Sequence, residues 1–148
     1  MLTVSQEAAA IPLAALTAVV GLYASDRLNL PQPTAPATEP ITIVIYGGSS
    51  AVGTYAIQFA KHSNIHPIIA VAGKAQDHVR SMLDSSKGDA IVDYRNGDKA
   101  VVQDIRNALQ GRKLLHAYDA TAGSNSFVNL SKVVEHEGGK ITLVLPPL

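Results

Sequence analysis

Residues 41 to 53 read Ile-Thr-Ile-Val-Ile-Tyr-Gly-Gly-Ser-Ser-Ala-Val-Gly, and this stretch decides the fold. It begins with a largely apolar run, Ile41 to Tyr46, which predicts a strand covered on both faces. The run ends at a glycine turn, and Ala51 to His62 then places apolar side chains on one helical side. A buried strand, a glycine turn and a helix together open a βαβ unit of the kind that binds dinucleotides.

The glycine turn is the candidate phosphate-binding loop. Against the pattern G-x-G-x-x-G it runs from Gly48 to Gly53, with Ser50 in place of the middle glycine. Backbone N–H groups at a helix N-terminus carry partial positive charge and face an incoming pyrophosphate. The Ser50 hydroxyl can also donate to a phosphate oxygen. A tight turn without a ligand fits the same letters. The candidate cofactor-binding residues are Gly48, Ser49, Ser50, Ala51, Val52 and Gly53.

Other nucleotide and catalytic motifs fail on particular residues. Gly53 is followed by Thr54 without the lysine of a Walker A loop, which disfavours ATP hydrolysis. Neither Ser49 nor Ser50 has the flanking glycines of a nucleophile elbow. No tyrosine has lysine four places on, which disfavours a short-chain dehydrogenase. Cysteine is missing altogether, so thiolate metal sites and disulfides are excluded, and we expect no metal site.

Composition fits one domain that binds a small molecule. The chain has 148 residues, 47% of them apolar and 16% charged, enough for a sizeable core. Twelve acidic residues balance twelve basic ones. This neutral balance gives no basic surface for nucleic acid or an anionic membrane, so neither partner is expected. Nothing in the composition points outside the cell, and we expect a cytoplasmic protein.

The first forty residues predict a helical segment and a linker. Ala8 to Ala24 is apolar but has no basic residue before it and is interrupted by Pro12, which favours a buried helical segment over a membrane span or signal peptide. We expect Pro12 to end one short helix or begin another. Residues 1–30 are thus predicted to pack as helix on the domain. Residues 31–40 contain four prolines and are predicted to be an extended linker: Pro31, Pro33, Pro36 and Pro40.

The remaining residues continue the alternation of strand and helix. Further strands are predicted over 67–72, 90–93, 114–120 and 140–145, and helices over 76–86, 98–110 and 126–136. Right-handed crossovers then predict an α/β, Rossmann-type doubly wound parallel sheet of five strands in the order 3-2-1-4-5, spanning residues 41–148. A ligand is expected above strands one and four, where Thr121, Ala122 and Gly123 face the glycine turn.

The end of the second strand indicates which dinucleotide is preferred. An NAD site places Asp or Glu there for the adenine ribose 2′-OH, but this chain has Gly73 and Lys74. An ammonium group attracts a 2′-phosphate, so NADPH is predicted over NADH, although Asp77 remains a candidate displaced acid for NADH. Tyr94, just past strand three, is expected beside the same pocket.

Several segments resemble a known superfamily: Glu7-Ala-Ala, Pro12-Leu-Ala-Ala-Leu-Thr-Ala18, Tyr46-Gly-Gly-Ser-Ser-Ala-Val-Gly53, Asp93-Tyr-Arg95 and Leu143-Val144. The chain is similar to medium-chain dehydrogenase/reductases, most of all to the zinc-independent quinone oxidoreductase and fungal trans-enoyl reductase branch. Members of that branch reduce quinones or activated double bonds with NADPH.

The resemblance also implies roles for single residues. By it, residues 49–52 match the phosphate loop, Gly73 and Lys74 the segment that meets the 2′-phosphate, and Tyr94 the aromatic beside it. Leu143 to Leu145 match the strand end on the nicotinamide side. The implied function is the NADPH-binding domain of an oxidoreductase. A non-catalytic NADPH sensor and, less well supported, a methyltransferase fragment remain alternatives.

Two departures from the family lead to further expectations. Such enzymes are more than twice as long and have a separate catalytic domain and a sixth strand, so this chain is expected to be inactive alone. The apolar edge at Ile141 to Leu145 would then be exposed. Exposed apolar edges pair with other strands, which predicts a homo-oligomer formed through strand five.

Overall fold

The computed structural model describes the backbone of residues 4–123 and 125–144, and side chains from residue 11 onward. Helices and strands alternate along the described chain. The helices are α1 (Val4–Tyr23), α2 (Ala51–His62), α3 (Gln76–Met82), α4 (Asp98–Leu109) and α5 (Ser126–Ser131), with 3-10 turns η1 (Ser85–Lys87) and η2 (Tyr94–Asn96). The strands are β1 (Ile43–Tyr46), β2 (Ile68–Ala72), β3 (Ala90–Asp93), β4 (His116–Asp119) and β5 (Lys140–Leu143).

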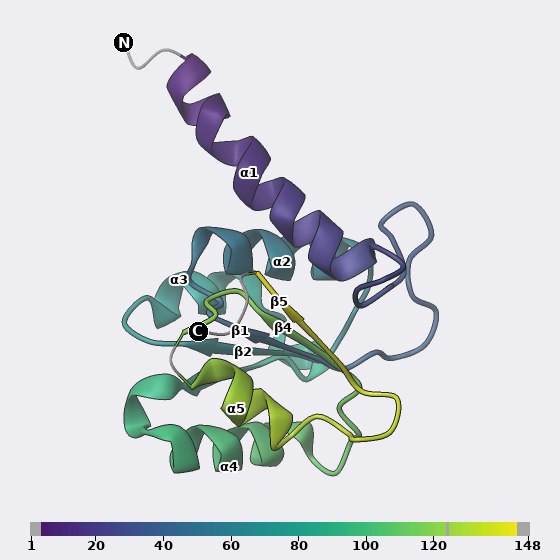
Figure 1. The fold of residues 1–148 in the computed structure, drawn as a ribbon, viewed down its shortest axis with the longest axis vertical. Helices are drawn as coiled ribbons and strands as arrows, with labels where there is room; N and C mark the ends of the chain where they lie inside the picture. Colours follow the sequence, from purple (N-terminus) through teal and green to yellow (C-terminus); the bar gives the residue numbers. More distant parts are fainter. Residues whose placement is uncertain (1–3, 124, 145–148) are drawn as a thin grey trace.

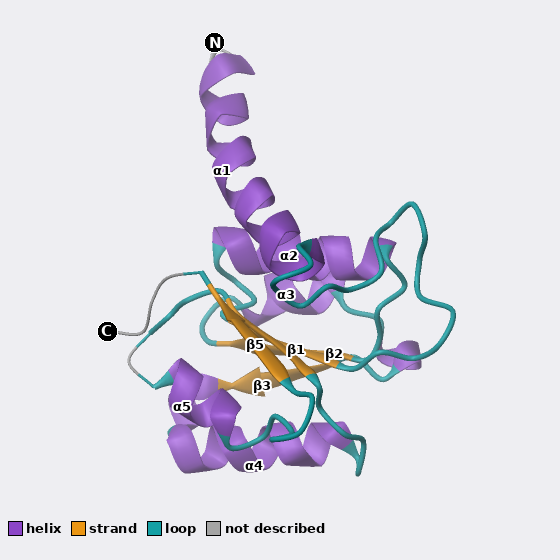
Figure 2. Ribbon diagram, turned by 45° about the vertical axis from the view of Figure 1, so that its right-hand side comes forward, coloured by secondary structure: helices purple, strands orange, loops and turns teal. Residues whose placement is uncertain are grey.

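The strands form one parallel sheet in the order β3-β2-β1-β4-β5, which confirms the predicted order. In the central register, Ile43 of β1 pairs with Ile68 of β2 on one side and His116 of β4 on the other. Helices α1, α2 and α3 lie on one face of the sheet, and α4 and α5 on the other (Figures 1 and 2). This is a doubly wound α/β fold.

The apolar runs of β1 and β2 are explained by burial on both faces, since every residue of these two strands is buried. Alternate side chains enter two separate cores. Ile43 and Ile45 pack with α1 and α2, whereas Val44 and Tyr46 pack with α4 and α5. The central strands are thereby fixed in position, and their carboxyl ends form a firm base for the loops that follow.

Helix α1 differs from the expectation, because it continues through Pro12 without a break. A proline removes one intrahelical hydrogen bond, and the first part of α1 projects away from the sheet (Figures 1 and 2), where water can bond the freed carbonyl. The second part packs on the domain through Ala18 and Leu22, both fully buried. Within the described residues, no helix combines the length and apolar character needed to cross a bilayer.

The proline-rich segment lies against the end of α2. Ala37 is buried, its N–H donates to the Ser63 carbonyl at 2.9 Å, and its carbonyl accepts from the Asn64 side chain at 2.8 Å. Leu28 and Leu30, just before the prolines, are also buried. The segment is therefore held to the domain by both hydrogen bonds and apolar contacts.

Two predicted helices are shorter in the structure. Helix α3 ends at Met82 and is followed by η1, and α5 ends at Ser131 although its apolar spacing continues to 136. After α5 the chain turns back, so that the Glu135 N–H donates to the Leu114 carbonyl at 2.9 Å. Val134 is still buried there, because it packs in the core from a turn rather than from a helix.

Candidate functional site

The turn between β1 and α2 is held by the neighbouring strand. The N–H groups of Gly47 and Gly48 both donate to the Val71 carbonyl at 2.9 Å, and the Ser50 N–H donates to the Gly47 carbonyl at 2.9 Å. Gly47 has φ of +82°, which favours glycine, and lies one residue before the aligned G-x-G-x-x-G pattern. A Cβ atom on Gly47 would lie 2.3 Å from Thr121 Cγ2, so the two loops meet there.

Helix α2 starts directly after this turn. Ser50 is the N-cap, and its hydroxyl oxygen accepts from the Gly53 N–H at 3.0 Å. A Cβ atom on Gly53 would lie 2.0 Å from the Gly47 carbonyl oxygen, so glycine lets the helix approach the turn closely. The N–H groups of Ala51 and Val52 lie in the first helical turn, where no intrahelical acceptor exists. These amides suit an anionic ligand.

The loop after β4 forms the opposite side of the site. The Ala120 N–H donates to the Tyr46 carbonyl at 2.9 Å, which fixes β4 beside the turn. The N–H groups of Thr121 and Ala122 donate to one carboxyl oxygen of Asp119 at 3.1 and 2.9 Å, and the Ser126 hydroxyl donates to the other oxygen. The conformation of the loop is thus set by hydrogen bonds to the carboxylate of Asp119, a buried residue of β4.

A cavity of about 410 Å³ opens between these two loops at the carboxyl ends of β1 and β4. Of the residues predicted from the sequence, five line it and Ala122 does not; the five are Ser49, Ser50, Tyr94, Thr121 and Gly123. Five residues that were not predicted from the sequence line it as well: Tyr46, Gly47, Asp98, Asn125 and Ser126. The sequence offered only their positions as a signal, because Tyr46 and Gly47 lie at the end of β1, and the other three lie at or next to the start of a helix.

The other residues predicted in the phosphate loop lie behind this cavity or at its edge. A Cβ atom on Gly48 would lie 3.2 Å from Ala70 and from Ile57, so Gly48 faces the core. Gly53 is buried, and Val52 is half-buried against the core of the α1 and α2 face. Ala51 is exposed. Any role of these four residues in binding comes through their backbone.

The ends of β2 and β3 meet at Tyr94, beyond the glycine turn. A Cβ atom on Gly73 would lie 2.7 Å from the Tyr94 ring, so glycine allows the ring to cover the end of β2. Tyr94 is 49% exposed on its other side, and Lys74 is exposed. Of the residues predicted at this end of the site, Tyr94 lines the cavity, whereas Gly73 and Lys74 do not.

The carboxyl group of Asp93 beside Tyr94 is neutralised by its neighbour. Arg95 Nη2 lies 2.6 Å from Asp93 Oδ2 and Arg95 Nε lies 2.9 Å from Oδ1. Hydrogen bonds from the Arg95 side chain, and then from its backbone N–H, lower the pKa of Asp93 to about 2. Because Arg95 compensates the negative charge of the Asp93 carboxylate, this carboxylate repels a 2′-phosphate less at the place where one is expected.

Asp98 and Asn125 line the far side of the cavity, and Asn129 supports Asp98 from behind. The side-chain amides of Asn125 and Asn129 donate to the Asp98 carboxylate at 2.7 and 2.9 Å, and hydrogen bonds of this kind, that from Asn129 first, lower the pKa of Asp98. Asn129 Oδ1 is buried and has no hydrogen-bond partner among the described residues. Burial raises the pKa of Tyr46, whose hydroxyl lies 3.5 Å from Asn129 Nδ2.

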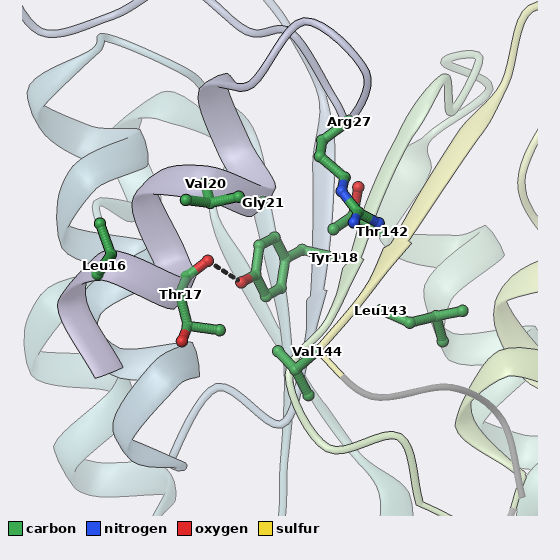
Figure 3. Close-up of a pocket in the computed structure, with 9 residues that line it drawn as sticks. All are labelled: Leu16, Thr17, Val20, Gly21, Arg27, Tyr118, Thr142, Leu143 and Val144. Atoms are coloured by element: carbon green, nitrogen blue, oxygen red, sulfur yellow. Dashed lines mark hydrogen bonds between the residues drawn. The ribbon is translucent and has the colours of Figure 1, made fainter. Parts of the chain in front are cut away.

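Leu143, predicted on the nicotinamide side, lies in a second cavity of about 280 Å³ between α1 and β5 (Figure 3). The Tyr118 hydroxyl donates there to the Thr17 carbonyl at 2.9 Å, and burial raises the pKa of Tyr118 to about 12. Leu145 lies outside the described residues. Leu143 does not line the cavity at the glycine turn.

In the parts of the chain that the structure describes, no three His, Cys, Asp or Glu side chains gather as a metal site would need. The buried pair of His66 Nδ1 and Asp89 Oδ1, 2.8 Å apart, adjoins the start of β2. It therefore lies at the opposite end of the sheet from the glycine turn.

Comparison with known proteins finds relatives among fungal reductases. The chain is 51% identical over 146 residues to the trans-enoyl reductase fsr4 of Gibberella fujikuroi, which covers 97% of this chain and 43% of that protein. It is 34% identical over 142 residues to the dehydrogenase pigH of Monascus ruber, covering 95% of this chain and 36% of that protein. The chain thus spans less than half the length of these relatives. No family model matches it.

Solved structures share the fold at lower identity. The CurK enoyl reductase superposes with a TM-score of 0.71 at 19% identity, over 93% of this chain and 36% of that one. A Pseudomonas syringae quinone oxidoreductase gives a TM-score of 0.68 at 20% identity, over 96% and 42%. A mycobacterial protein solved in complex with NADPH gives 0.66 at 18%, over 97% and 47%.

These findings confirm the resemblance seen in the sequence. The relatives are trans-enoyl reductases, and the matching folds include enoyl and quinone reductases. The chain is similar over nearly its whole length to part of the fungal trans-enoyl reductases, and it shares a Rossmann fold with solved enoyl and quinone reductases.

Proposed function

We propose that this chain is the NADPH-binding domain of a zinc-independent reductase that transfers hydride to an enoyl double bond or a quinone. The observation that carries the proposal is the cavity between the glycine turn and the loop after β4, at the topological switch point of the sheet. The 51% identity to a trans-enoyl reductase favours the enoyl substrate class.

The donors at the site suit a dinucleotide diphosphate. The first amides of α2, those of Ala51 and Val52, have no intrahelical acceptor, and Ser50 uses its oxygen to accept from Gly53. The Ser50 hydroxyl hydrogen is left to donate outward. Capping and phosphate binding are therefore compatible on one side chain.

The opposite end of the site suits a 2′-phosphate. Lys74 supplies a cation, Gly73 admits the Tyr94 ring, and Arg95 compensates the charge of Asp93. Thr121 is assigned to the nicotinamide side by its place after β4 at the switch point of the sheet, and Leu143 to Leu145 by the family resemblance alone. When bound, the nicotinamide supplies the hydride chemistry, and this chain's residues bind and orient it.

Reaction with substrate is proposed to need more of the protein than this chain. The relatives are more than twice as long as the part matched here. We assign no substrate contact or proton donor to these 148 residues, and expect the chain alone to bind cofactor without turnover. A cytoplasmic location belongs to the same proposal.

Calorimetric titration with NADPH, NADH and S-adenosylmethionine tests the proposal. We expect NADPH to bind about tenfold to a hundredfold more tightly than NADH, because a charged hydrogen bond contributes roughly 1.5 to 3 kcal/mol. Lys74→Ala is expected to remove most of that preference, and Lys61→Ala, an exposed lysine at the other end of α2, to keep it.

The remaining outcomes separate the alternatives. Binding of S-adenosylmethionine but not NADPH would favour the hypothesis that the chain is a methyltransferase fragment. A preference for NADH that is lost in Asp77→Asn would assign the acidic role to that exposed residue of α3. NADPH binding by the chain, together with no reductase activity in the whole protein, would favour a sensor.

A further inference from the structure

Asp119 is a buried carboxyl group that does not line the cavity. It ends β4 with no exposed surface. One carboxyl oxygen accepts from the Thr121 N–H at 3.1 Å, the Thr121 hydroxyl at 2.9 Å and the Ala122 N–H at 2.9 Å. The other accepts from the Ser126 hydroxyl at 2.5 Å. Burying a carboxyl is costly unless it is hydrogen-bonded in this way.

Three of these bonds come from the loop after β4 and the fourth comes from Ser126, the first residue of α5, and of these residues Thr121 and Ser126 line one wall of the cavity. The loop makes further bonds among these same residues: the Gly123 N–H donates to the Thr121 hydroxyl, and the Ser126 hydroxyl also contacts the Gly123 carbonyl at 2.9 Å. Ala122 has φ of +46°, a conformation that costs a non-glycine residue about 1 to 2 kcal/mol. The bonds to Asp119 on both sides of it offset that strain.

The loop is in turn set against the glycine turn. The Thr121 methyl group fills the space next to Gly47, where a Cβ atom would lie 2.3 Å away. Thr121 and Ser126 both line the cavity and both bond to Asp119. The position of that wall therefore depends on a side chain that no ligand in the cavity would touch.

We infer that Asp119 is a positioning residue whose hydrogen bonds hold Thr121, Ala122 and Ser126 at the correct distance from the glycine turn for a dinucleotide. The inference rests on the proposed NADPH-binding function for its ligand. The geometry assigns the role to hydrogen bonding at two oxygens rather than to negative charge, because every partner is a neutral donor.

Two substitutions of Asp119 separate the effect of its hydrogen bonds from the effect of its negative charge. Asp119→Ala leaves the two loop amides without an acceptor inside the protein. Asp119→Asn keeps one oxygen for Thr121 and Ala122, and its amide can donate to the Ser126 oxygen, while the Ser126 hydroxyl donates to the Gly123 carbonyl. The asparagine is therefore expected to restore the loop.

Asp89 provides a matched control at the opposite end of the sheet. It is also buried, and its carboxyl accepts from the Ile68 N–H at 2.7 Å and the Asp84 N–H at 2.9 Å. Asp89→Ala removes a comparable set of bonds far from the cavity. It reports the effect of lost stability alone.

The experiment measures NADPH affinity by calorimetry and amide hydrogen exchange of residues 119–126 in the 148-residue chain. We expect Asp119→Ala to weaken NADPH binding by about tenfold or more and to speed exchange in this segment. We expect Asp119→Asn to bind within about threefold of the wild type. Asp89→Ala is expected to lower the unfolding midpoint but to keep both NADPH affinity and exchange in 119–126.

Other results overturn the inference. These are an unchanged affinity in Asp119→Ala, an equal loss in Asp89→Ala, or a loss in Asp119→Asn as large as in Asp119→Ala. If Asp119→Ala does not fold, Ser126→Ala replaces it, and exchange in 119–126 no faster than in the wild type refutes the role. If the wild type binds no NADPH, the proposed function fails, and the exchange data alone decide whether Asp119 holds the loop.

Discussion

At the scale of single residues, the shape of the site depends on glycines, which have no Cβ atom. Gly47 and Gly53 let the turn, α2 and the loop after β4 approach within distances that a Cβ atom would block. The sequence shows that glycines are there but not which neighbour each one meets. That neighbour comes from a distant loop in the case of Gly47, since Thr121 lies 74 residues further along the chain, the difference between the two residue numbers.

Gly47→Ala tests this contact. Left-handed backbone costs alanine about 1 to 2 kcal/mol, and the overlap with Thr121 adds about 1 to 3 kcal/mol of overpacking. Gly138→Ala is the matched control, because Gly138 has φ of +76° with nothing within 4 Å of the added Cβ. Urea unfolding should show a larger loss for Gly47→Ala. Equal losses would mean that the two loops are free to move apart.

A second prediction concerns the charge at the end of β3. Arg95→Ala removes the hydrogen bonds that hold the pKa of Asp93 at about 2, so that pKa should rise toward 3.8. Because the folded pKa is depressed, the pair stabilises the protein above about pH 4, and this contribution is lost as pH falls toward 2. Carboxyl NMR titration measures the change. Arg80→Ala, an arginine on α3, should leave the pKa of Asp93 where it is.

The sequence predicted Tyr94 and Thr121 at the cavity but not Asp98 or Asn125. Tyr94 and Thr121 follow directly after strands, where a parallel sheet places its ligand-binding loops. Asp98 and Asn125 lie at or next to helix starts, where acidic and amide residues are common for capping reasons alone. Their hydrogen bond to each other joins α4 to the loop before α5, and sequence spacing carries no sign of it.

At the scale of elements, periodicity predicted the order of helices and strands but not all of their ends. Helix α1 runs through Pro12, because one lost hydrogen bond is tolerable on a projecting helix. Helix α5 stops at Ser131, because backbone bonding to Leu114 takes over while the apolar spacing continues. In both cases the extent of the helix is set by tertiary packing or by contact with solvent, and the local sequence pattern does not contain this information.

The link between α1 and the sheet gives an element-scale prediction. Tyr118→Phe removes the hydrogen bond to the Thr17 carbonyl (Figure 3) and should lower the free energy of unfolding by about 1 kcal/mol at pH 7. The raised pKa of Tyr118 means that the unfolded chain ionises first, so wild-type stability should fall between pH 10 and about 12.

Urea unfolding at pH 7 and at pH 11 measures both effects. The phenylalanine variant should lose less stability on going to high pH than the wild type does. Tyr55→Phe is the control, because within the described residues the Tyr55 hydroxyl makes no hydrogen bond. A similar loss in both variants would show that Tyr118 does not hold α1.

At the scale of the whole molecule, the order of the strands was predictable from the right-handed crossovers between parallel strands. Self-association of the chain depends instead on which surfaces are exposed. Within the described residues, β5 pairs with β4 alone, which leaves one side of it open. Lys140 and Val144 donate their N–H groups toward β4, so strand alternation directs the N–H groups of Ile141 and Leu143 to the open side. Helix α1 also carries exposed apolar side chains, Leu13 among them, so its surface is a second candidate for contact between copies of the chain.

We expect the chain to self-associate through this edge. Leu143→Pro removes an outward N–H without touching the bonds to β4, and should shift the sedimentation coefficient toward the monomer. Leu13→Ser removes a side chain that is 77% exposed on α1 and should leave association unchanged. Dissociation by the α1 variant instead, or a wild type that sediments as a monomer, would contradict the edge interface.

The two hydrogen bonds that Val71 accepts from the glycine turn have a consequence for affinity. The backbone around a diphosphate is immobilised by the protein's own strands, so the conformational entropy of that backbone is lost during folding. It need not be lost again when a nucleotide arrives, and more of the intrinsic contact energy is retained as binding free energy. Rigidity in β2, a strand that supplies no side chain to the cavity, thus contributes to how tightly a nucleotide is held.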